Sequence, residues 1–161
     1  MNMPMMKMPA VTAEHERLWR LVGTWSGPDV QAPMPWSPGG EGTSTLTFTR
    51  ALDGFGLLLD HVQTRDGKVV FRGHGVYMLE PGTPEVLWYW FDSIGFPPQA
   101  PGRGGWEGDV LTIVRKTARG EAHHVWQLDG DRLIHRIDST LVAPGARATL
   151  LSGTYSRVKA G

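Results

Sequence analysis

The sequence predicts an all-β domain, a closed antiparallel up-and-down barrel of about nine or ten strands with one short N-terminal helix. Composition is the first reason, because 21 glycines and seven tryptophans in 161 residues suit a turn-rich β domain. The second is the stretch Val86–Ser93, whose alternation places Trp88, Trp90 and Asp92 on one face of a strand. Both faces of this strand need cover. A barrel supplies it if one face lines the lumen and the other packs under a helix or cap.

The N-terminal region is expected to hold a tail and the helix. Residues 1–12 contain prolines and no periodic pattern, which predicts a disordered tail ahead of a single domain over residues 13–159. Thr12 is a good N-cap, and an apolar stripe from Leu18 to Val22 precedes Gly23. We therefore expect a helix of roughly ten residues that ends at this glycine.

The remaining chain alternates between strand patterns and turns. Asp-Gly and Pro-Gly pairs separate most of the segments, as in antiparallel hairpins. The predicted strands cover residues 23–27, 42–51, 55–64, 68–79, 86–93, 110–116, 121–128, 133–142 and 147–158. Residues 28–41 and 94–105 are rich in Gly and Pro and are expected to form long loops at the barrel mouth. Met34 and Trp36 make the first of these loops a candidate lid.

Charge and composition exclude several classes of protein. Sixteen basic and sixteen acidic side chains cancel, and no basic run is interleaved with aromatic residues, so neither nucleic acid nor a membrane is an expected partner. The absence of cysteine removes disulfides and thiolate chemistry. No apolar run is long enough for a membrane span or a signal peptide. We expect a cytoplasmic protein.

Four short motifs carry a resemblance to a known family. They are Leu21–Gly27, Phe71–Val76, Trp90–Ser93 and Trp106–Gly108, and their order and spacing cover about residues 14–158. In these motifs the chain resembles the DUF1579 family of bacterial proteins of unknown function. The resemblance implies a calycin-like barrel of the lipocalin or fatty-acid-binding-protein kind with a central cavity. It also implies that Trp25, in a Gly-x-Trp motif shared with lipocalins and nitrobindins, closes one barrel end.

The tryptophans give the leading hypothesis for function, which is the binding of a small lipophilic molecule, aromatic or acyl, in the lumen. More indoles are present than one small core needs, and an aromatic cavity with a few polar groups is the usual form of a ligand site. A plain core with an oligomer face is the alternative, so a homodimer is possible. The candidate ligand-binding residues are Trp36, His61, His74, Trp88, Trp90, Asp92, Trp106, His124, Trp126 and Arg136. Among these, Arg136 is the arginine expected to reach a ligand carboxylate.

Two other functions remain open. One is a cofactor-free enzyme, an isomerase, cyclase or hydrolase, in which a lumenal His/Asp pair transfers a proton. Its candidate catalytic residues are His74, Asp92 and His124, although Asp92 could instead cap a turn.

The other is haem or metal binding through histidine. No two histidines have the i, i+2 spacing that would put both on one strand face, and adjacent His123 and His124 must diverge. Nitrobindins resemble this chain and hold haem through a histidine near the C-terminus, whereas the last strand, Ala148–Ser156, has none. We therefore expect neither a cofactor nor a metal.

Overall fold

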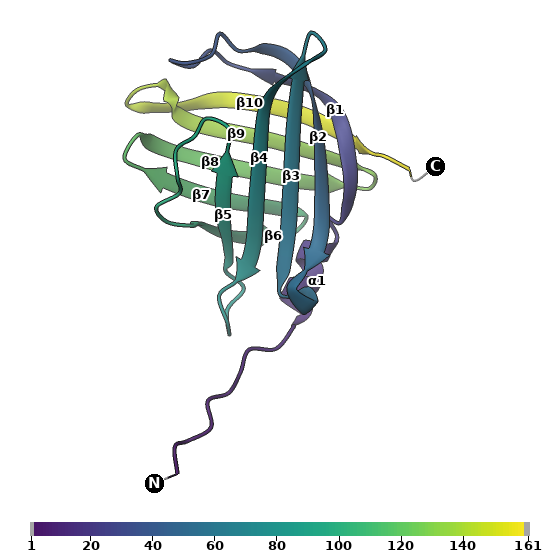
Figure 1. Ribbon diagram of the computed structural model, residues 1–161, viewed down its shortest axis with the longest axis vertical. Coiled ribbons are helices and arrows are strands. Elements are labelled where there is room, and N and C mark those ends of the chain that lie inside the picture. Colours follow the sequence, from purple (N-terminus) through teal and green to yellow (C-terminus); the bar gives the residue numbers. More distant parts are fainter. Residues whose placement is uncertain (1, 160–161) are drawn as a thin grey trace.

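The computed structural model describes residues 2–159 and shows a closed barrel of ten antiparallel strands (Figure 1). Each strand pairs with its neighbours in the sequence, and pairing of β1 with β10 closes the ring. The strands are β1 (Gly23–Gln31), β2 (Gly40–Ala51), β3 (Gly56–Arg65), β4 (Lys68–Leu79), β5 (Val86–Asp92), β6 (Gly102–Glu107), β7 (Val110–Thr117), β8 (Gly120–Asp129), β9 (Arg132–Ala143) and β10 (Ala146–Arg157). The all-β barrel with one short N-terminal helix is thus confirmed.

The helix α1 (Ala13–Trp19) covers one end of the barrel, at the bottom of Figure 1. Thr12 is the N-cap, and its backbone N–H donates to His15 Nδ1 at 3.0 Å. Arg17 donates to the carbonyl oxygen of Gly108 at 3.0 Å, which ties the helix to the β6–β7 turn. The helix is shorter than expected because the chain after Trp19 tightens into turns with i→i+3 hydrogen bonds.

Trp25 stands where the helix gives way to the first strand. Its ring is fully buried, and Nε1 donates to the carbonyl oxygen of Leu21 at 2.8 Å. The guanidinium of Arg157 lies over the ring, 4.1 Å from its centroid. The side chain therefore seals the end of the barrel that α1 covers.

Two loops are shorter than the sequence predicted. Strand β1 continues through Pro28 to Gln31, because this proline needs no amide partner where the pairing of β1 with β10 is interrupted. The second loop ends at Pro101, where the short strand β6 begins. β6 pairs with β5 at only three positions and with β7 at five.

The outer face of β5 lacks the cover that we expected. Tyr89 and Phe91 are exposed, since α1 lies at the end of the barrel and not over this face. The idea that this face packs under a helix is wrong; its use in a homodimer stays a prediction. Within residues 2–159, none of the helical segments has the length and apolar character required to span a bilayer.

Candidate functional site

A cavity of about 470 Å³ opens at the end of the barrel opposite α1. Turns and strand ends form its mouth, where Trp36, Ile94 and Phe96 are partly exposed. The guanidinium of Arg119 lies 3.6 Å from the centroid of the Phe96 ring and so connects the β5–β6 loop with the β7–β8 turn. Trp36 lies in a tight turn closed by hydrogen bonds between Met34 and Ser37.

Aromatic side chains form one wall of the cavity. Trp88 and Trp90 point inward from β5, with ring centroids 5.0 Å apart. Phe71 on β4 stacks on Trp90 at 6.2 Å with an interplanar angle of 19°. The prediction from the alternation of β5, that both indoles share one face, is confirmed, and this face lines the cavity.

Glycines on β4 make room for these rings. A Cβ atom at Gly73 would lie 2.2 Å from the Trp90 ring, and one at Gly75 would lie 2.6 Å from Trp88 Nε1. The two glycines of the Gly73-His74-Gly75 motif thus leave the space that the indoles of the aromatic wall occupy.

A buried polar network centred on Asp29 lies beside the cavity. The carboxylate accepts hydrogen bonds from the hydroxyl of Ser44, from Gln63 Nε2 at 2.9 Å and from Tyr155 OH at 3.0 Å. Ser44 Oγ also contacts His61 Nε2 at 2.8 Å. Gly153 leaves space for the Tyr155 hydroxyl, since a Cβ there would lie 2.3 Å from it.

Three histidines lie in the cavity wall: His61, His124 and His135. Burial lowers the pKa of His61 to about 4 and that of His124 to about 3, and it holds the pKa of His135 well below its usual value. All three are therefore neutral at pH 7. The His135 ring stacks on Trp126, with centroids 3.5 Å apart and planes within 5°.

Asp92 and Arg115 contribute charge near the mouth. Asp92 Oδ2 accepts from Trp90 Nε1 at 2.8 Å, and Oδ1 accepts from the backbone N–H of Ile94 at 3.0 Å. Asp92 thus caps the turn after β5 and fixes the Trp90 ring. Burial lowers the pKa of Arg115, while Asp92 opposes this shift.

Seven of the ten predicted binding residues line the cavity and three lie elsewhere. The seven are Trp36, His61, Trp88, Trp90, Asp92, His124 and Trp126. His74 is on the outside of β4, where its Nδ1 pairs with Asp60 at 2.8 Å. Arg136 is on the outside of β9 and pairs with Asp138 at 3.1 Å. Trp106 lies at the closed end, with the Arg20 guanidinium 5.0 Å from its ring centroid.

These placements correct the acid–base hypothesis. Phe91 is the β5 residue opposite His74, and Asp92 is opposite Gly73, so the side chains of His74 and Asp92 leave the sheet on opposite faces. The two cannot share a proton. Asp92 and His124, the other two candidates, both line the cavity. The carboxylate and imidazole that hydrogen bonds connect inside the barrel are those of Asp29 and His61, through Ser44.

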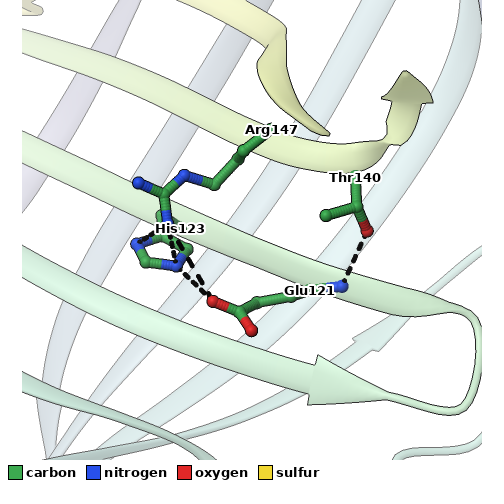
Figure 2. A network of polar contacts seen from close by, with 4 residues as sticks. All are labelled: Glu121, His123, Thr140 and Arg147. Atoms are coloured by element: carbon green, nitrogen blue, oxygen red, sulfur yellow. Dashed lines mark hydrogen bonds and ion pairs between the residues drawn. The ribbon is translucent and has the colours of Figure 1, made fainter. Parts of the chain in front are cut away.

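His123 points away from the cavity, as its adjacency to His124 required. Figure 2 shows it on the outer surface between Glu121 and Arg147, and its Nε2 lies 2.6 Å from Glu121 Oε1. The backbone N–H of Glu121 donates to Thr140 Oγ1 at 3.1 Å. Among residues 2–159, no three His, Asp or Glu side chains are grouped as a metal site. β10 contains no histidine, and haem binding stays untested.

The Asp29 network is a feature that we did not predict from the sequence. Asp29 follows Pro28 in a stretch that we expected to be a loop. We therefore did not extend the strand alternation from Trp25 to Asp29, although it puts both side chains on the same face. His61 was selected for its residue type alone, although Leu57, Leu59 and Gln63 share its face of β3. His135 could have been found in the same way, because Leu133 and Ile137 flank it at i±2.

Solved structures show what the barrel is similar to. The crystal structure of Rv2717c from M. tuberculosis matches with a TM-score of 0.72 and 17% identity, covering 93% of this chain and 100% of that one. The fold is a calycin-like barrel. The S-type phycobiliprotein lyase CPES from Guillardia theta matches with a TM-score of 0.64 and 14% identity, covering 91% of this chain and 92% of that one.

At these identities the likeness concerns the fold alone. No protein-family model matches the chain, and no curated protein matches it significantly. The DUF1579 resemblance therefore stays a prediction.

Proposed function

We propose that the barrel binds a small lipophilic molecule in the cavity opposite α1. The observation that carries this proposal is the cavity itself, about 470 Å³ in volume and walled by Phe71, Trp88, Trp90 and Trp126. Ligand sites in proteins typically measure roughly 300–1,000 Å³ and combine apolar walls with a few polar groups. The volume suits a molecule of two or three fused rings or a medium-length acyl chain.

The mouth supports a lipophilic ligand as well. Trp36, Val70 and Phe96 line the entrance and remain partly exposed. The transfer of an apolar molecule from water to such apolar side chains is favourable. The histidines farther inside are neutral, so they offer no cation for an anionic group; the cations of the lining are the arginines Arg65, Arg115 and Arg119.

A titration of the full chain with 1-aminoanthracene tests the proposal. We expect saturable quenching of tryptophan fluorescence together with an increase in probe emission, because Trp88 and Trp90 lie in the cavity wall. Ala122→Trp places a large ring in the wall of the cavity and is expected to weaken binding at least tenfold.

The matched control is Val125→Trp on the same strand, between the cavity residues His124 and Trp126 and therefore directed outward. It should bind the probe as the unmodified chain does. Equal binding by Ala122→Trp and Val125→Trp would place the probe outside the cavity and would refute the proposal. Haem, added in the same way, is expected to give no shifted Soret band.

A further inference from the structure

We infer that the ligand carries a neutral hydrogen-bond donor on an aromatic frame, as a phenol does, and that His61 Nδ1 accepts this hydrogen bond. The inference rests on the proposed function and adds the chemical class of the ligand. Its basis is the chain of hydrogen bonds from Asp29 through Ser44 to His61, which determines where the imidazole carries its proton.

The direction of each hydrogen bond in this chain follows from the groups involved. A carboxylate can only accept, and Asp29 receives the hydroxyl proton of Ser44 as well as donors from Gln63 and Tyr155. Ser44 has a single proton, so its oxygen can only accept from His61 Nε2, 2.8 Å away. The neutral imidazole therefore carries its proton on Nε2 and a lone pair on Nδ1.

The lone pair on Nδ1 is directed at the cavity. His61 lines the cavity and is only 6% exposed, while Nε2 is used toward Ser44. Among the described residues Nδ1 has no hydrogen-bond partner. It is also not one of the fully buried polar atoms without a partner, so it keeps some exposure. An acceptor in such a place is satisfied by water in the free protein and by a donor group of the ligand in the complex.

The groups next to His61 Nδ1 favour a neutral aromatic donor over an anion at this point of the cavity. A carboxylate at this point would face the Nδ1 lone pair, and the Asp29 charge beyond it already accepts three donors. The rings of Phe71 and Trp90 lie 5.4 and 6.4 Å from the His61 ring, centroid to centroid. A planar molecule can therefore contact both rings while its hydroxyl meets Nδ1.

Three naphthalene derivatives of one frame test the inference by isothermal titration calorimetry at pH 7.5. We expect 2-naphthol to bind about tenfold more tightly than 2-methoxynaphthalene, which lacks the donor, because one buried hydrogen bond has about that effect. The anion 2-naphthoate should bind most weakly.

Variants connect this preference to His61. His61→Phe should lose the preference for naphthol over its ether while still binding both. Ser44→Ala should reduce the preference, because without the Ser44 hydroxyl the imidazole proton is no longer held on Nε2. His74→Phe, on the outer face, should keep the preference. Nitrogen NMR of the unmodified chain should show a proton on Nε2 of His61 and a perturbation of Nδ1 only when naphthol is added, a readout independent of variant folding.

The outcomes separate the inference from the proposed function. Equal binding of naphthol and its ether, or tighter binding of naphthoate, would overturn the inference and leave the cavity as a ligand site. If none of the three compounds binds and 1-aminoanthracene also fails, both proposals fall.

Discussion

His61, His124 and His135 are the residues whose chemistry the barrel changes most. Their rings lie in the cavity wall with little access to solvent, and within residues 2–159 no charged partner lies within ion-pair distance of them. Neither ring nitrogen of His135 has a hydrogen-bond partner in the part of the chain that the structure describes. Each ring can therefore take up a proton in the unfolded chain far more readily than in the barrel.

The difference in pKa predicts an acid-sensitive fold. An unfolded histidine has a pKa near 6.5, against about 4 for His61 and about 3 for His124 in the barrel. Below pH 6.5 the unfolded chain binds more protons, so the free energy of unfolding should fall by up to about 1.4 kcal/mol per pH unit for each buried histidine. This contribution is complete above pH 6.5 and is lost progressively from there to about pH 4 for His61 and to about pH 3 for His124. Urea denaturation at pH 7.0, 6.0 and 5.0 measures the slope.

Two variants control this measurement. His135→Phe keeps an aromatic ring on Trp126 and should reduce the slope by about one proton. His74→Phe changes an exposed histidine and should leave the slope nearly unchanged. A free energy of unfolding that stays constant between pH 7.0 and 5.0 would contradict the prediction.

The direction of individual side chains was only partly predictable. On β5 the alternation of side chains predicted which residues share a face, and Trp88, Trp90 and Asp92 do lie on the same, inner face. On β4 the two neighbours of His74 in the sequence, Gly73 and Gly75, lie on the inner face and have no side chain. No apolar residue directly beside His74 therefore indicates that the imidazole points outward. The reason for those glycines, the space taken by two indoles of the neighbouring strand, lies outside β4 itself.

At the scale of elements, the paired strands β4 and β5 act as one unit that positions the aromatic wall. Seven residues of β4 pair with seven of β5, and Gly75 is directly opposite Trp90. Because the glycines lack side chains, the indoles can lie flat against β4 and leave the lumen open. The elements that the sequence missed, the end of β1 and all of β6, contain proline or glycine, which strand patterns disfavour.

Gly73→Ala is predicted to disturb this unit. The new methyl group would meet the Trp90 ring at 2.2 Å and push it toward the lumen. Overpacking of this kind typically costs about 1–3 kcal/mol in the free energy of unfolding, and the smaller cavity should weaken 1-aminoanthracene binding. Gly105→Ala on β6 is the matched control, since the nearest atom to its added Cβ is 3.7 Å away. If both variants bind and unfold alike, the glycine has no part in shaping the wall.

At the scale of the whole molecule, Trp25 and α1 close one end of the barrel, and the cavity opens at the other. Figure 1 shows α1 at the closed end. The closing pair, β1 with β10, joins residues far apart in the sequence, so closure was predicted indirectly, from the cover that both faces of residues 86–93 need and from the spacing of the strands. Whether the lumen is filled or hollow was beyond the sequence. The same indoles can plug a barrel or line it, depending on how the glycines opposite them let the rings turn.

A ligand in the lumen should stabilise the entire barrel. The cavity is lined by side chains from β1, β3, β4, β5, β7, β8, β9 and β10, so an occupant contacts most of the closed sheet, and the unfolded chain offers no such site. Binding to the folded state alone adds about 2.7 kcal/mol at a ligand concentration of one hundred times Kd. For a chain of this size that corresponds to a rise in Tm of roughly 5–11 °C, measurable by differential scanning calorimetry with 1-aminoanthracene. The rise should grow with the logarithm of ligand concentration and should be absent in Ala122→Trp. Quenching without any rise in Tm would mean that the probe meets exposed indoles such as Trp36 and not the lumen.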